Sequence, residues 1–385
     1  MPFNTTQLQA LPTPSYVYDR ALLDSTLAAI KAETHDNTSC HVHYAIKAND
    51  NPEVLSAIAR EGFGADCVSG GEIRAAIEAN FPASEIAFAG VGKADWEIRL
   101  ALNLGIGMFN VESREELAVI SELATDTGTI AHISLRINPD VEASTHAHIT
   151  TGCAENKFGI AHKDMITTIR QAQSLPNIDF VGLHFHIGSQ LLDMSDFESL
   201  CLRINELQEL LEGEGIEVRN INVGGGLGVS YDDPDGHPIA NFAAYFETFR
   251  RHLKLRQGQQ LHFELGRAIV AQMGSLLTRV LYVKHTAVKD FVILDAGMTE
   301  LIRPALYGAL HKIENVTASE RKETEDKVMY DVVGPICESS DVFAYDYPLP
   351  RTCRGDLMLI RSAGAYGQTM ASTYNHRPLP QAFIL

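Results

Sequence analysis

The sequence predicts an α/β fold in which a (β/α)8 barrel is joined to a second, mostly-β domain. Between residues 40 and 266, eight short apolar runs alternate with longer segments of helical periodicity, and this alternation is typical of a parallel barrel. After residue 270 the strand-like runs continue with few helical segments between them, which indicates a β-rich domain. The length of 385 residues is sufficient for both.

The barrel strands are expected at regular intervals, separated by segments with apolar residues at helical spacing. The clearest helical segment is 196–215, where Leu200, Ile204 and Leu207 would share one face and glycines mark the end. We expect the eight strands at 41–47, 64–69, 86–90, 107–112, 131–138, 180–188, 218–226 and 260–266.

The β-rich domain is predicted from four strand-like runs in the last third of the chain. The polar and charged stretch 314–327 between them is expected to be an exposed loop. The four runs are 275–285, 290–297, 328–334 and 356–364.

Four of the predicted barrel strands carry polar or small residues at alternate positions. On 41–47 this set ends with Lys47, and on 260–266 it includes His262 and Glu264. Successive strand residues face opposite sides, so these sets should point into the barrel while the apolar sets pack on helices. A barrel interior is usually filled by branched aliphatic residues. A polar interior therefore indicates a functional site near the carboxyl ends of the strands.

The composition excludes two classes of partner and suggests a compartment. With a net charge of −18, the chain is not expected to bind nucleic acid or an anionic membrane, although a local group of arginines can still bind an anionic substrate. The six cysteines lack C-x-x-C spacing, which suggests free thiols in a reducing compartment. We see neither a signal peptide nor an apolar run of membrane-spanning length, and we expect a cytoplasmic protein.

Lys47 is the first candidate for chemistry, because a lysine is rarely buried without a partner. One interpretation is an ion pair with Asp66 or Glu264. The other is a Schiff-base lysine, since removal from water lowers the pKa of the amine and makes it a nucleophile.

Two further motifs offer an anion site and a carboxylate. The consecutive glycines 224–226 follow a predicted strand and would let backbone N–H groups approach an anion. Their spacing is neither that of a P-loop nor that of a dinucleotide-binding fold. Glu264 stands at a strand end with Arg267 just beyond it. This carboxylate could form a structural ion pair, or it could keep a pyridine nitrogen protonated.

Histidines and one cysteine complete the candidates. Two histidine pairs, His41 with His43 and His184 with His186, alternate on predicted strands, as metal ligands can. The first pair begins its strand and the second ends its own, so the two pairs should lie at different depths of the barrel. A third pair, His146 and His148, stands in a loop-like stretch. We therefore expect no metal site and interpret His186 as stacking on an aromatic cofactor. Cys337, beside Glu338, is either a small buried apolar residue or an acid that protonates a carbanion.

Together these motifs resemble the fold-type III pyridoxal-phosphate decarboxylases over nearly the whole chain. The resemblance implies an alanine-racemase-like architecture. Its barrel would bind the cofactor over 28–272, and its β-rich domain, 1–27 and 273–385, would contribute to the active site and to a homodimer interface. The motifs are PTPSYVYD (12–19), YAIKAND (44–50), GADCVSGGE (64–72), ENKFGI (155–160), GLHFHIGSQ (182–190), NVGGGLG (222–228), ELGR (264–267), DAGMTELIRPALYGALH (295–311), VVGPICESSD (332–341) and GAYGQTMASTYNHRP (364–378).

The resemblance also implies a role for each candidate. Lys47 would bind pyridoxal phosphate as a Schiff base, Glu264 would pair with the pyridine nitrogen, and Cys337 would donate a proton in the neighbouring subunit's site. The catalytic set would be Lys47, Cys337, His186 and Glu264. The cofactor set would be Lys47, His186, Ser189, Gly224, Gly225, Gly226, Glu264, Gly266, Arg267 and Tyr366. The substrate set would be Arg267, Arg303, Tyr307, Glu338 and Tyr366.

One residue departs from the family pattern. Leu265 stands where the family usually has a proline between the glutamate and the glycine of ELGR. By alternation Leu265 faces the helices, so Glu264 and Arg267 are expected to keep their orientation even though leucine leaves φ less restricted.

The implied reaction is a decarboxylation in lysine biosynthesis, from meso-2,6-diaminopimelate to L-lysine and carbon dioxide. This substrate keeps a distal carboxylate, and Arg267, Arg303 and Tyr307 have the chemistry to hold it. Carboxynorspermidine or another basic amino acid is the alternative substrate for a decarboxylase of this fold.

Three other functions remain to be compared with this one. An amino-acid racemase needs two opposed bases and an unprotonated ring nitrogen, which Glu264 argues against. A non-enzymatic pyridoxal-phosphate carrier would be a lone barrel. A metal hydrolase would need a carboxylate near paired histidines at one end of the barrel.

Overall fold

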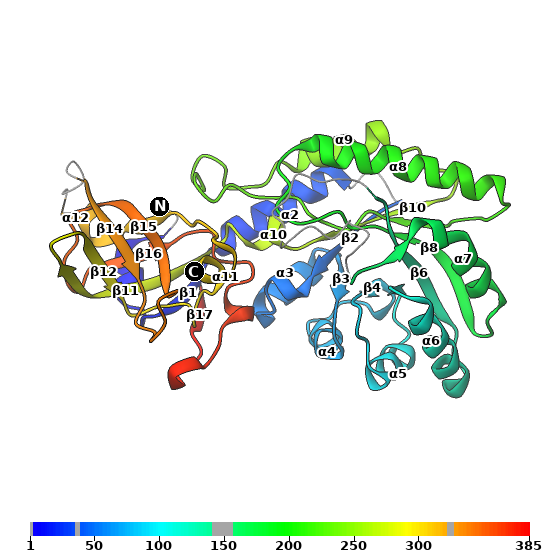
Figure 1. The fold of residues 1–385 in the computed structure, drawn as a ribbon, viewed down its shortest axis with the longest axis horizontal. Helices are drawn as coiled ribbons and strands as arrows, with labels where there is room; N and C mark the ends of the chain where they lie inside the picture. Colours follow the sequence, from blue (N-terminus) through cyan, green and yellow to red (C-terminus); the bar gives the residue numbers. More distant parts are fainter. Residues whose placement is uncertain (1–2, 35–38, 141–156, 322–326) are drawn as a thin grey trace. The chain divides into compact units, whose positions relative to one another are not determined.

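The computed structural model describes residues 3–34, 39–140, 157–321 and 327–385 and divides into two compact units (Figure 1). His146, His148, Cys153 and the start of the ENKFGI motif lie outside the described residues. The barrel unit consists of Leu27–Gly228 and Asn241–Gly266. The β-rich unit consists of Met1–Thr26, Val229–Ala240 and Arg267–Leu385.

The barrel unit contains eight parallel strands that pair in chain order, and the last of them, β10, pairs back with β2. A short strand, β7 (Ile160–Ala161), adds to β6. The predicted barrel and all eight of its strands are confirmed, most of them shorter than predicted. Their bounds are β2 Cys40–Ala45, β3 Gly64–Cys67, β4 Ile86–Phe88, β5 Met108–Val111, β6 Ala131–Asn138, β8 Ile178–His184, β9 Asn220–Asn222 and β10 Gln260–Leu265.

Helices occupy the segments between the barrel strands (Figure 1). In α3 (Pro52–Arg60) the side chain of Asn51 accepts hydrogen bonds from the first-turn N–H groups and proline stands at the first helical position, so the start of the helix is encoded locally. The other helices are α2 Arg20–Thr34, which enters this unit at Leu27, α4 Gly70–Glu78, α5 Asp95–Leu104, α6 Arg114–Thr127, α7 Met165–Ser174, α8 Met194–Gly213 and α9 Phe242–His252.

The two faces of β10 show the predicted division between helices and interior. Phe263 packs edge-on against Tyr245, Phe246 and Phe249 of α9, with ring centroids 4.9–5.7 Å apart. The flanking residue Glu264 instead contacts polar side chains of other barrel strands. Because residues on a strand alternate between faces, the apolar outer wall and polar interior predicted for 260–266 are both confirmed.

The prediction that Lys47 is the last inward residue of its strand is wrong. Strand β2 ends at Ala45, and Lys47 lies in the 3₁₀ turn η1 (Ile46–Ala48) that follows. Its side chain is 41% exposed rather than buried. The chain turns here because Asn49 N–H bonds back to the carbonyl of Ile46, which ends the strand before the alternation reaches the lysine.

The β-rich unit holds one sheet in the order β13-β16-β11-β12-β14-β15, with β1 paired to β11 and β17. The predicted strands are confirmed as β11 (Gly274–His285), β12 (Asp290–Leu294), β14 (Lys327–Val333) and β16 (Leu357–Ile360). Four strands were not predicted from the sequence: β1 Ser15–Tyr18, β13 Ile313–Asn315, β15 Val342–Pro350 and β17 Gln381–Ile384.

The predicted exposed loop at 314–327 is wrong in its first part. Strand β13 continues to Asn315, and helix α12 (Val316–Glu320) follows; residues 322–326 lie outside the described part of the chain. Val316 is buried in a core cluster with Leu8, Val17 and Leu277. Val316 and Ala318, both fully buried, anchor this otherwise polar segment. The remaining helices of the unit are α1 Thr5–Gln9, α10 Arg267–Val270 and α11 Arg303–Tyr307.

The described residues contain no helix that combines the length and hydropathy needed to cross a bilayer.

Candidate functional site

Polar side chains converge on Glu264 inside the barrel. Its Oε1 accepts hydrogen bonds from the side-chain amides of Asn110 at 2.9 Å and Asn222 at 2.8 Å. Its Oε2 lies 3.0 Å from Nε2 of His184. The four residues come from β10, β5, β9 and β8, and all are buried. Barrel enzymes keep their sites at the carboxyl ends of the strands, and these residues stand there.

Glu264 remains ionised although it is buried. Burial opposes the charged form, but the charges of His184 and Lys47 and the hydrogen bonds from His184 and Asn222 outweigh it and hold the pKa below the ordinary value. The barrel therefore contains a fixed negative charge with its lone pairs directed by two amides and an imidazole.

Lys47 pairs with Asp66, the first of the two partners that the sequence suggested. Nζ of Lys47 lies 2.9 Å from Oδ2 of Asp66, whose side chain is fully buried. Burial and the nearby charge of Glu264 raise the pKa of Asp66, and Lys47 opposes that effect. The amine thus lies at the mouth of the barrel with a carboxylate beneath it.

The glycine run follows β9 and makes close backbone contacts. Gly224 and Gly226 have φ of +69° and +112°, which side chains other than glycine rarely adopt. A Cβ on Gly225 would overlap the carbonyl oxygen of Glu264. The loop therefore presents bare backbone, as an anion cradle requires.

His186 lies beside this loop. Its Nδ1 accepts a 3.4 Å hydrogen bond from the N–H of Gly225. Burial, followed by the charges of Arg136 and Lys47, lowers the pKa of His186 to about 3, so the imidazole is neutral at physiological pH. Ser189 follows in the same loop and is half-buried.

Gly266 closes the barrel side of the site. A Cβ there would lie 3.1 Å from Cβ of Ala45 and 3.2 Å from Cβ of Ala48. This is tighter than ordinary side-chain packing, so the glycine lets the end of β10 approach the turn that carries Lys47.

A second cluster lies in the β-rich unit and is built on two buried arginines. Arg267 donates to the hydroxyl of Tyr231 at 2.6 Å and lies over the ring of Tyr366, 5.0 Å from its centroid. Arg303 lies 4.8 Å from the centroid of Tyr231 and donates to Nε2 of His311 at 3.0 Å. Aromatic faces attract cations, but these partners do not neutralise the two charges.

The two guanidinium groups affect one another. Burial lowers the pKa of Arg303, and the neighbouring charge of Arg267 lowers it further. Burial and the charge of Arg303 also lower the pKa of His311 to about 3, so His311 is a neutral acceptor. Two buried like charges beside neutral partners have the chemistry of a carboxylate-binding site.

Tyr366 and Tyr307 contribute to this cluster in different ways. Tyr366 has φ of +55°, a conformation that is strained for an aromatic residue and that recurs at functional sites. Tyr307 ends helix α11, four residues after Arg303, and is exposed.

Cys337 and Glu338 lie together at the surface of the β-rich unit. The N–H of Cys337 donates to Oδ1 of Asn375 at 3.0 Å, and Glu338 accepts a 2.6 Å hydrogen bond from the hydroxyl of Tyr374. The cysteine is exposed, so it is not the small buried apolar residue of the first interpretation.

Two of the three predicted histidine pairs lie in the described part of the chain, where other side chains contact them. The rings of His41 and His43 each lie close to that of His262, with centroids 4.8 and 5.2 Å from it, while His184 contacts Glu264. Among the residues that the structure describes, no three His, Cys, Asp or Glu side chains converge as metal ligands.

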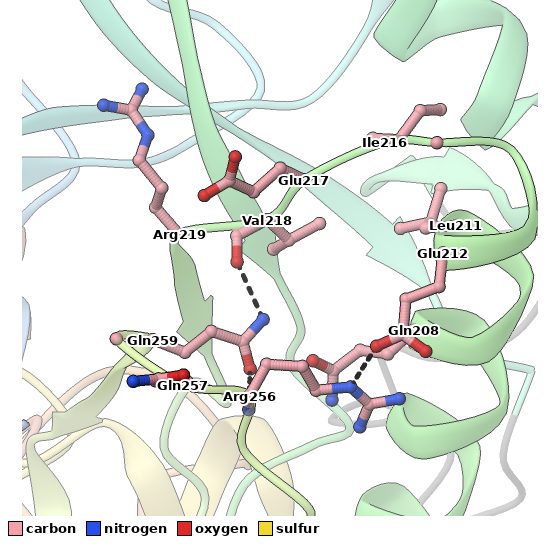
Figure 2. Close-up of a pocket in the computed structure, with 12 residues that line it drawn as sticks. Gln208, Leu211, Glu212, Ile216, Glu217, Val218, Arg219, Arg256, Gln257 and Gln259 are labelled. Atoms are coloured by element: carbon pink, nitrogen blue, oxygen red, sulfur yellow. Dashed lines mark hydrogen bonds and ion pairs between the residues drawn. The ribbon is translucent and has the colours of Figure 1, made fainter.

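A separate cavity of about 560 Å³ opens at the amino ends of β9 and β10 (Figure 2). The end of α8, residues 215–219 and residues 256–259 line it, and the amide of Gln259 bridges to the carbonyl of Val218. The sequence-predicted site residues do not line this cavity, which lies at the opposite end of the strands from Glu264.

Sequence reasoning missed several residues that shape the two clusters. Asn110 and Asn222 stand at strand ends, so their position was a usable signal, but nothing in the local sequence linked them to Glu264. Tyr231 and His311 lie in segments without strand or helix periodicity. His311 ends the motif 295–311, but nothing in the sequence singled out its side chain, and Tyr231 lies in no motif.

The chain is similar to proteins and solved structures of one enzyme family. Residues 23–271 match the family described as "Pyridoxal-dependent decarboxylase, pyridoxal binding domain". The diaminopimelate decarboxylase of Bacteroides thetaiotaomicron is 58% identical over 381 residues, covering 99% of this chain and 97% of that protein. The Zymomonas mobilis enzyme of the same name is 43% identical over 369 residues, covering 95% and 86%. The solved structure of diaminopimelate decarboxylase from Helicobacter pylori complexed with L-lysine has a TM-score of 0.92 at 40% identity, covering 99% and 94%.

Proposed function

Because the chain belongs to the pyridoxal-dependent decarboxylases, we propose that it converts meso-diaminopimelate to L-lysine and carbon dioxide. Two full-length relatives carry the name of that activity, and a similar solved structure holds L-lysine. The observation in this chain that carries the proposal is the pair of buried arginines, Arg267 and Arg303, because a distal carboxylate on the substrate needs cationic partners.

The barrel unit fits the family's cofactor, pyridoxal phosphate. It supplies an amine at Lys47, a carboxylate held ionised at Glu264, and a glycine loop whose bare backbone suits a phosphate. It also contains buried polar atoms without partners among the described residues, Oδ1 of Asp66 and Nδ1 of His184. We assign the cofactor to Lys47, His186, Ser189, Gly224, Gly225, Gly226, Glu264, Gly266, Arg267 and Tyr366.

Glu264 supplies the electrostatic part of the reaction. When bound, the pyridine ring of the cofactor accepts the electrons that remain after carbon dioxide leaves. A carboxylate can keep the pyridine nitrogen protonated and so strengthen that electron demand. Asn110, Asn222 and His184 fix the orientation of the carboxylate before any ligand arrives, which avoids reorganisation during the reaction.

His186 supplies a neutral, oriented ring. Since its Nδ1 accepts from Gly225 and the pKa of the imidazole is about 3, its remaining proton belongs on Nε2. We assign it to the face of the cofactor ring, where an uncharged imidazole packs without opposing the positive pyridinium.

The β-rich unit supplies the groups for substrate. We assign the substrate carboxylates to Arg267, Arg303 and Tyr307, with Tyr366 beside them. A carboxylate would give the buried guanidinium of Arg303 an anionic partner, which the neutral imidazole of His311 is not. We assign the distal ammonium to Glu338 and the proton donor to Cys337, whose thiol would protonate the carbanion carbon.

The substrate assignment is tested by carbon-dioxide release from a panel of amino acids. We expect release from meso-diaminopimelate and much slower release from ornithine and arginine, which lack a distal carboxylate. Carboxynorspermidine is the informative rival because it keeps one. No release from meso-diaminopimelate would remove the proposed substrate.

We further propose that the enzyme is a homodimer in which Cys337 and Glu338 complete the neighbouring subunit's site. Both lie at the surface of their own unit. The test mixes two inactive variants, Lys47→Ala and Cys337→Ala, after dissociation. If sites are shared, about half of all dimers are mixed at equal amounts, and each mixed dimer regains one of its two sites. The mixture then has roughly a quarter of the wild-type activity. No recovery would place both residues in one chain's own site.

We place the reaction in the cytoplasm. Five of the six cysteines lie in the described part of the chain, and all five are free, which suits a reducing compartment.

A further inference from the structure

His311 is buried in the arginine cluster of the β-rich unit, and each nitrogen of its ring faces a partner of fixed hydrogen-bonding character. Nδ1 lies 2.9 Å from the carbonyl oxygen of Arg361, which can only accept a hydrogen bond. Nε2 lies 3.0 Å from Nη1 of Arg303, which can only donate one. The ring proton therefore belongs on Nδ1, and Nε2 directs a lone pair at Arg303.

These two contacts also require the imidazole to be uncharged. A second proton, on Nε2, would place an N–H group against the guanidinium of Arg303 and remove the hydrogen bond between them. Burial, followed by the charge of Arg303, lowers the pKa of His311 to about 3, in agreement with the contacts. The ring of Tyr231 lies nearly perpendicular to the imidazole, with centroids 5.0 Å apart. The orientation of His311 is thus restricted as well as its protonation.

The local fold brings His311 back to Arg303, which lies eight positions earlier in the chain. Arg303 begins α11, and Gly308 ends that helix with a φ of +62°, which lets the chain reverse. The carbonyl of Lys312 then accepts a 2.9 Å hydrogen bond from the N–H of Arg361, next to the pairing of β13 with β16. This backbone contact holds Arg361 alongside His311.

Arg361 is itself held in place. Its guanidinium is buried and donates to Glu314 at 3.0 Å and to Asp235 at 3.1 Å. Lys312 pairs with the same two carboxylates, at 3.2 and 2.8 Å. The carbonyl oxygen that receives the Nδ1 proton of His311 therefore belongs to an anchored residue, which explains how one tautomer is selected.

A neutral acceptor has a specific advantage beside a cation that is to bind an anionic substrate. A carboxylate in the place of the imidazole would also orient Arg303, but it would cancel the charge that attracts the substrate carboxylate. The lone pair of His311 orients one N–H of the guanidinium and leaves the positive charge in place. The phenol ring of Tyr231, 4.8 Å from the guanidinium carbon, leaves it as well.

We propose that His311 is a positioning residue for the reaction, whose neutral Nε2 orients the guanidinium of Arg303 for the substrate carboxylate without cancelling its charge. The inference rests on the proposed function, because it concerns the substrate-binding role given there to Arg303. His311 itself makes no bond to the substrate. It acts on the binding of the carboxylate and leaves the bond-breaking steps to other residues, so its loss should change KM rather than kcat.

Carbon-dioxide release from meso-diaminopimelate by the cofactor-loaded enzyme tests this with three substitutions. His311→Phe keeps a buried ring without an acceptor and should raise KM roughly 10-fold, about the contribution of one hydrogen bond to a charged group. Its kcat should stay close to that of the wild type. His311→Gln should restore KM, since Oε1 of glutamine can accept from Arg303. His311→Glu also offers an acceptor but cancels the charge, so it should raise KM at least as much as His311→Phe.

The matched control is His43→Phe, which should keep the KM of the wild type. His43 is also a buried histidine, with Nδ1 3.1 Å from a backbone carbonyl oxygen and Nε2 2.9 Å from a side-chain partner, but that partner is His262 rather than an arginine. Three outcomes would overturn the proposal: a wild-type KM in His311→Phe, a KM in His311→Gln as high as in His311→Phe, or a KM in His311→Glu as low as in His311→Gln.

Nuclear magnetic resonance of the full-length enzyme labelled with ¹⁵N-histidine gives a measurement that does not depend on turnover. The ring of His311, assigned by the loss of its signals in His311→Gln, should carry a proton on Nδ1 and none on Nε2. A proton on Nε2 would overturn the inference, even if His311→Phe does not fold. Failure of the proposed function gives a different result, because the wild-type enzyme itself would then release no carbon dioxide from meso-diaminopimelate.

Discussion

The imidazole of His184 and the carboxylate of Glu264 lie 3.0 Å apart, Nε2 to Oε2, and both are buried at the carboxyl end of the barrel. Asn110 and Asn222 donate to the other oxygen of the same carboxylate. Burial opposes the ionised form, but the charges of His184 and Lys47 and the hydrogen bonds from His184 and Asn222 outweigh it and hold the pKa of Glu264 below its ordinary value. The barrel therefore holds a negative charge in one orientation, which a pyridine nitrogen requires to stay protonated.

Glu264→Gln should lower kcat by roughly 100-fold or more, because a neutral amide cannot stabilise the protonated ring, and removing one such electrostatic partner typically costs this much. Cofactor attachment at Lys47 should survive, as measured by borohydride reduction and peptide mass. The control is Glu116→Gln, which removes another mostly buried carboxylate, the partner of Lys93 at 2.6 Å, and should keep its kcat. An unchanged kcat in Glu264→Gln would refute the role of this carboxylate.

Arg303→Lys should raise KM for meso-diaminopimelate by roughly 10- to 100-fold, since hydrogen bonds between charged groups contribute about 1.5–3 kcal/mol and lysine cannot bind bidentately. Steady-state carbon-dioxide release measures this. Arg354→Lys is the matched control, because Arg354 also lies over a tyrosine ring, 5.3 Å from the centroid of Tyr282, but is exposed. Equal KM values in the two variants would exclude Arg303 from substrate binding.

Cys337→Ala should bind cofactor normally and turn over roughly 100- to 10,000-fold more slowly, the range expected for loss of a general acid. Cofactor absorbance and carbon-dioxide release separate the two properties. Cys353 is also exposed and free, so Cys353→Ala controls for loss of a surface thiol and should retain full activity. A wild-type rate in Cys337→Ala would require another proton donor.

The sequence predicted most of what the barrel contributes, because alternation along a strand is a local signal. It placed His184, His262 and Glu264 inward and Phe263 outward, as observed. It failed for Lys47 because strand ends depend on backbone hydrogen bonds that the alternation does not contain. The turn after Ala45 moved the lysine out of the strand and into contact with Asp66.

The second cluster was less accessible to sequence reasoning. Tyr231 lies in 229–240, a segment between two parts of the barrel sequence that nevertheless clusters with the β-rich unit. Its contacts with Arg267 and Arg303 join residues more than thirty positions apart. Such contacts come from tertiary packing, which overrides local pattern. The resemblance to a family named both arginines, but not the tyrosine between them.

Gly225→Ala should weaken cofactor binding and destabilise the barrel. A Cβ there overlaps the carbonyl oxygen of Glu264, and the backbone must shift to relieve the contact, typically at a cost of about 1–3 kcal/mol. Cofactor titration and urea unfolding measure the two effects. Gly213→Ala is the control, because nothing lies within 4 Å of its added Cβ, and it should bind cofactor as the wild type does. Equal affinities in both variants would contradict the cradle.

Acid should destabilise the barrel through His262, whose ring lies close to those of His41 and His43. Its Nδ1 lies 2.9 Å from Nε2 of His43, while its Nε2 is buried and has no partner among the described residues. Burial, followed by the charges of His43 and His41, lowers the pKa of His262 to about 2. In the unfolded chain a histidine titrates near its ordinary value of about 6.5.

The sign of the pH effect follows from these two values. Between about pH 6.5 and about pH 2 the unfolded state binds the proton and the folded state does not. The free energy of unfolding therefore falls as pH falls, by up to roughly 1.4 kcal/mol per pH unit.

The variant His262→Phe keeps an aromatic ring at this position but has no titrating nitrogen. It should be less stable than the wild type at about pH 7, through loss of the contact with His43, and should lose this disadvantage at lower pH. Urea unfolding between about pH 7 and about pH 5 measures the difference, and His285→Phe, at an exposed histidine, should show no such convergence with the wild type. If the wild-type and His262→Phe stabilities fall in parallel over that range, His262 is not held neutral by the fold.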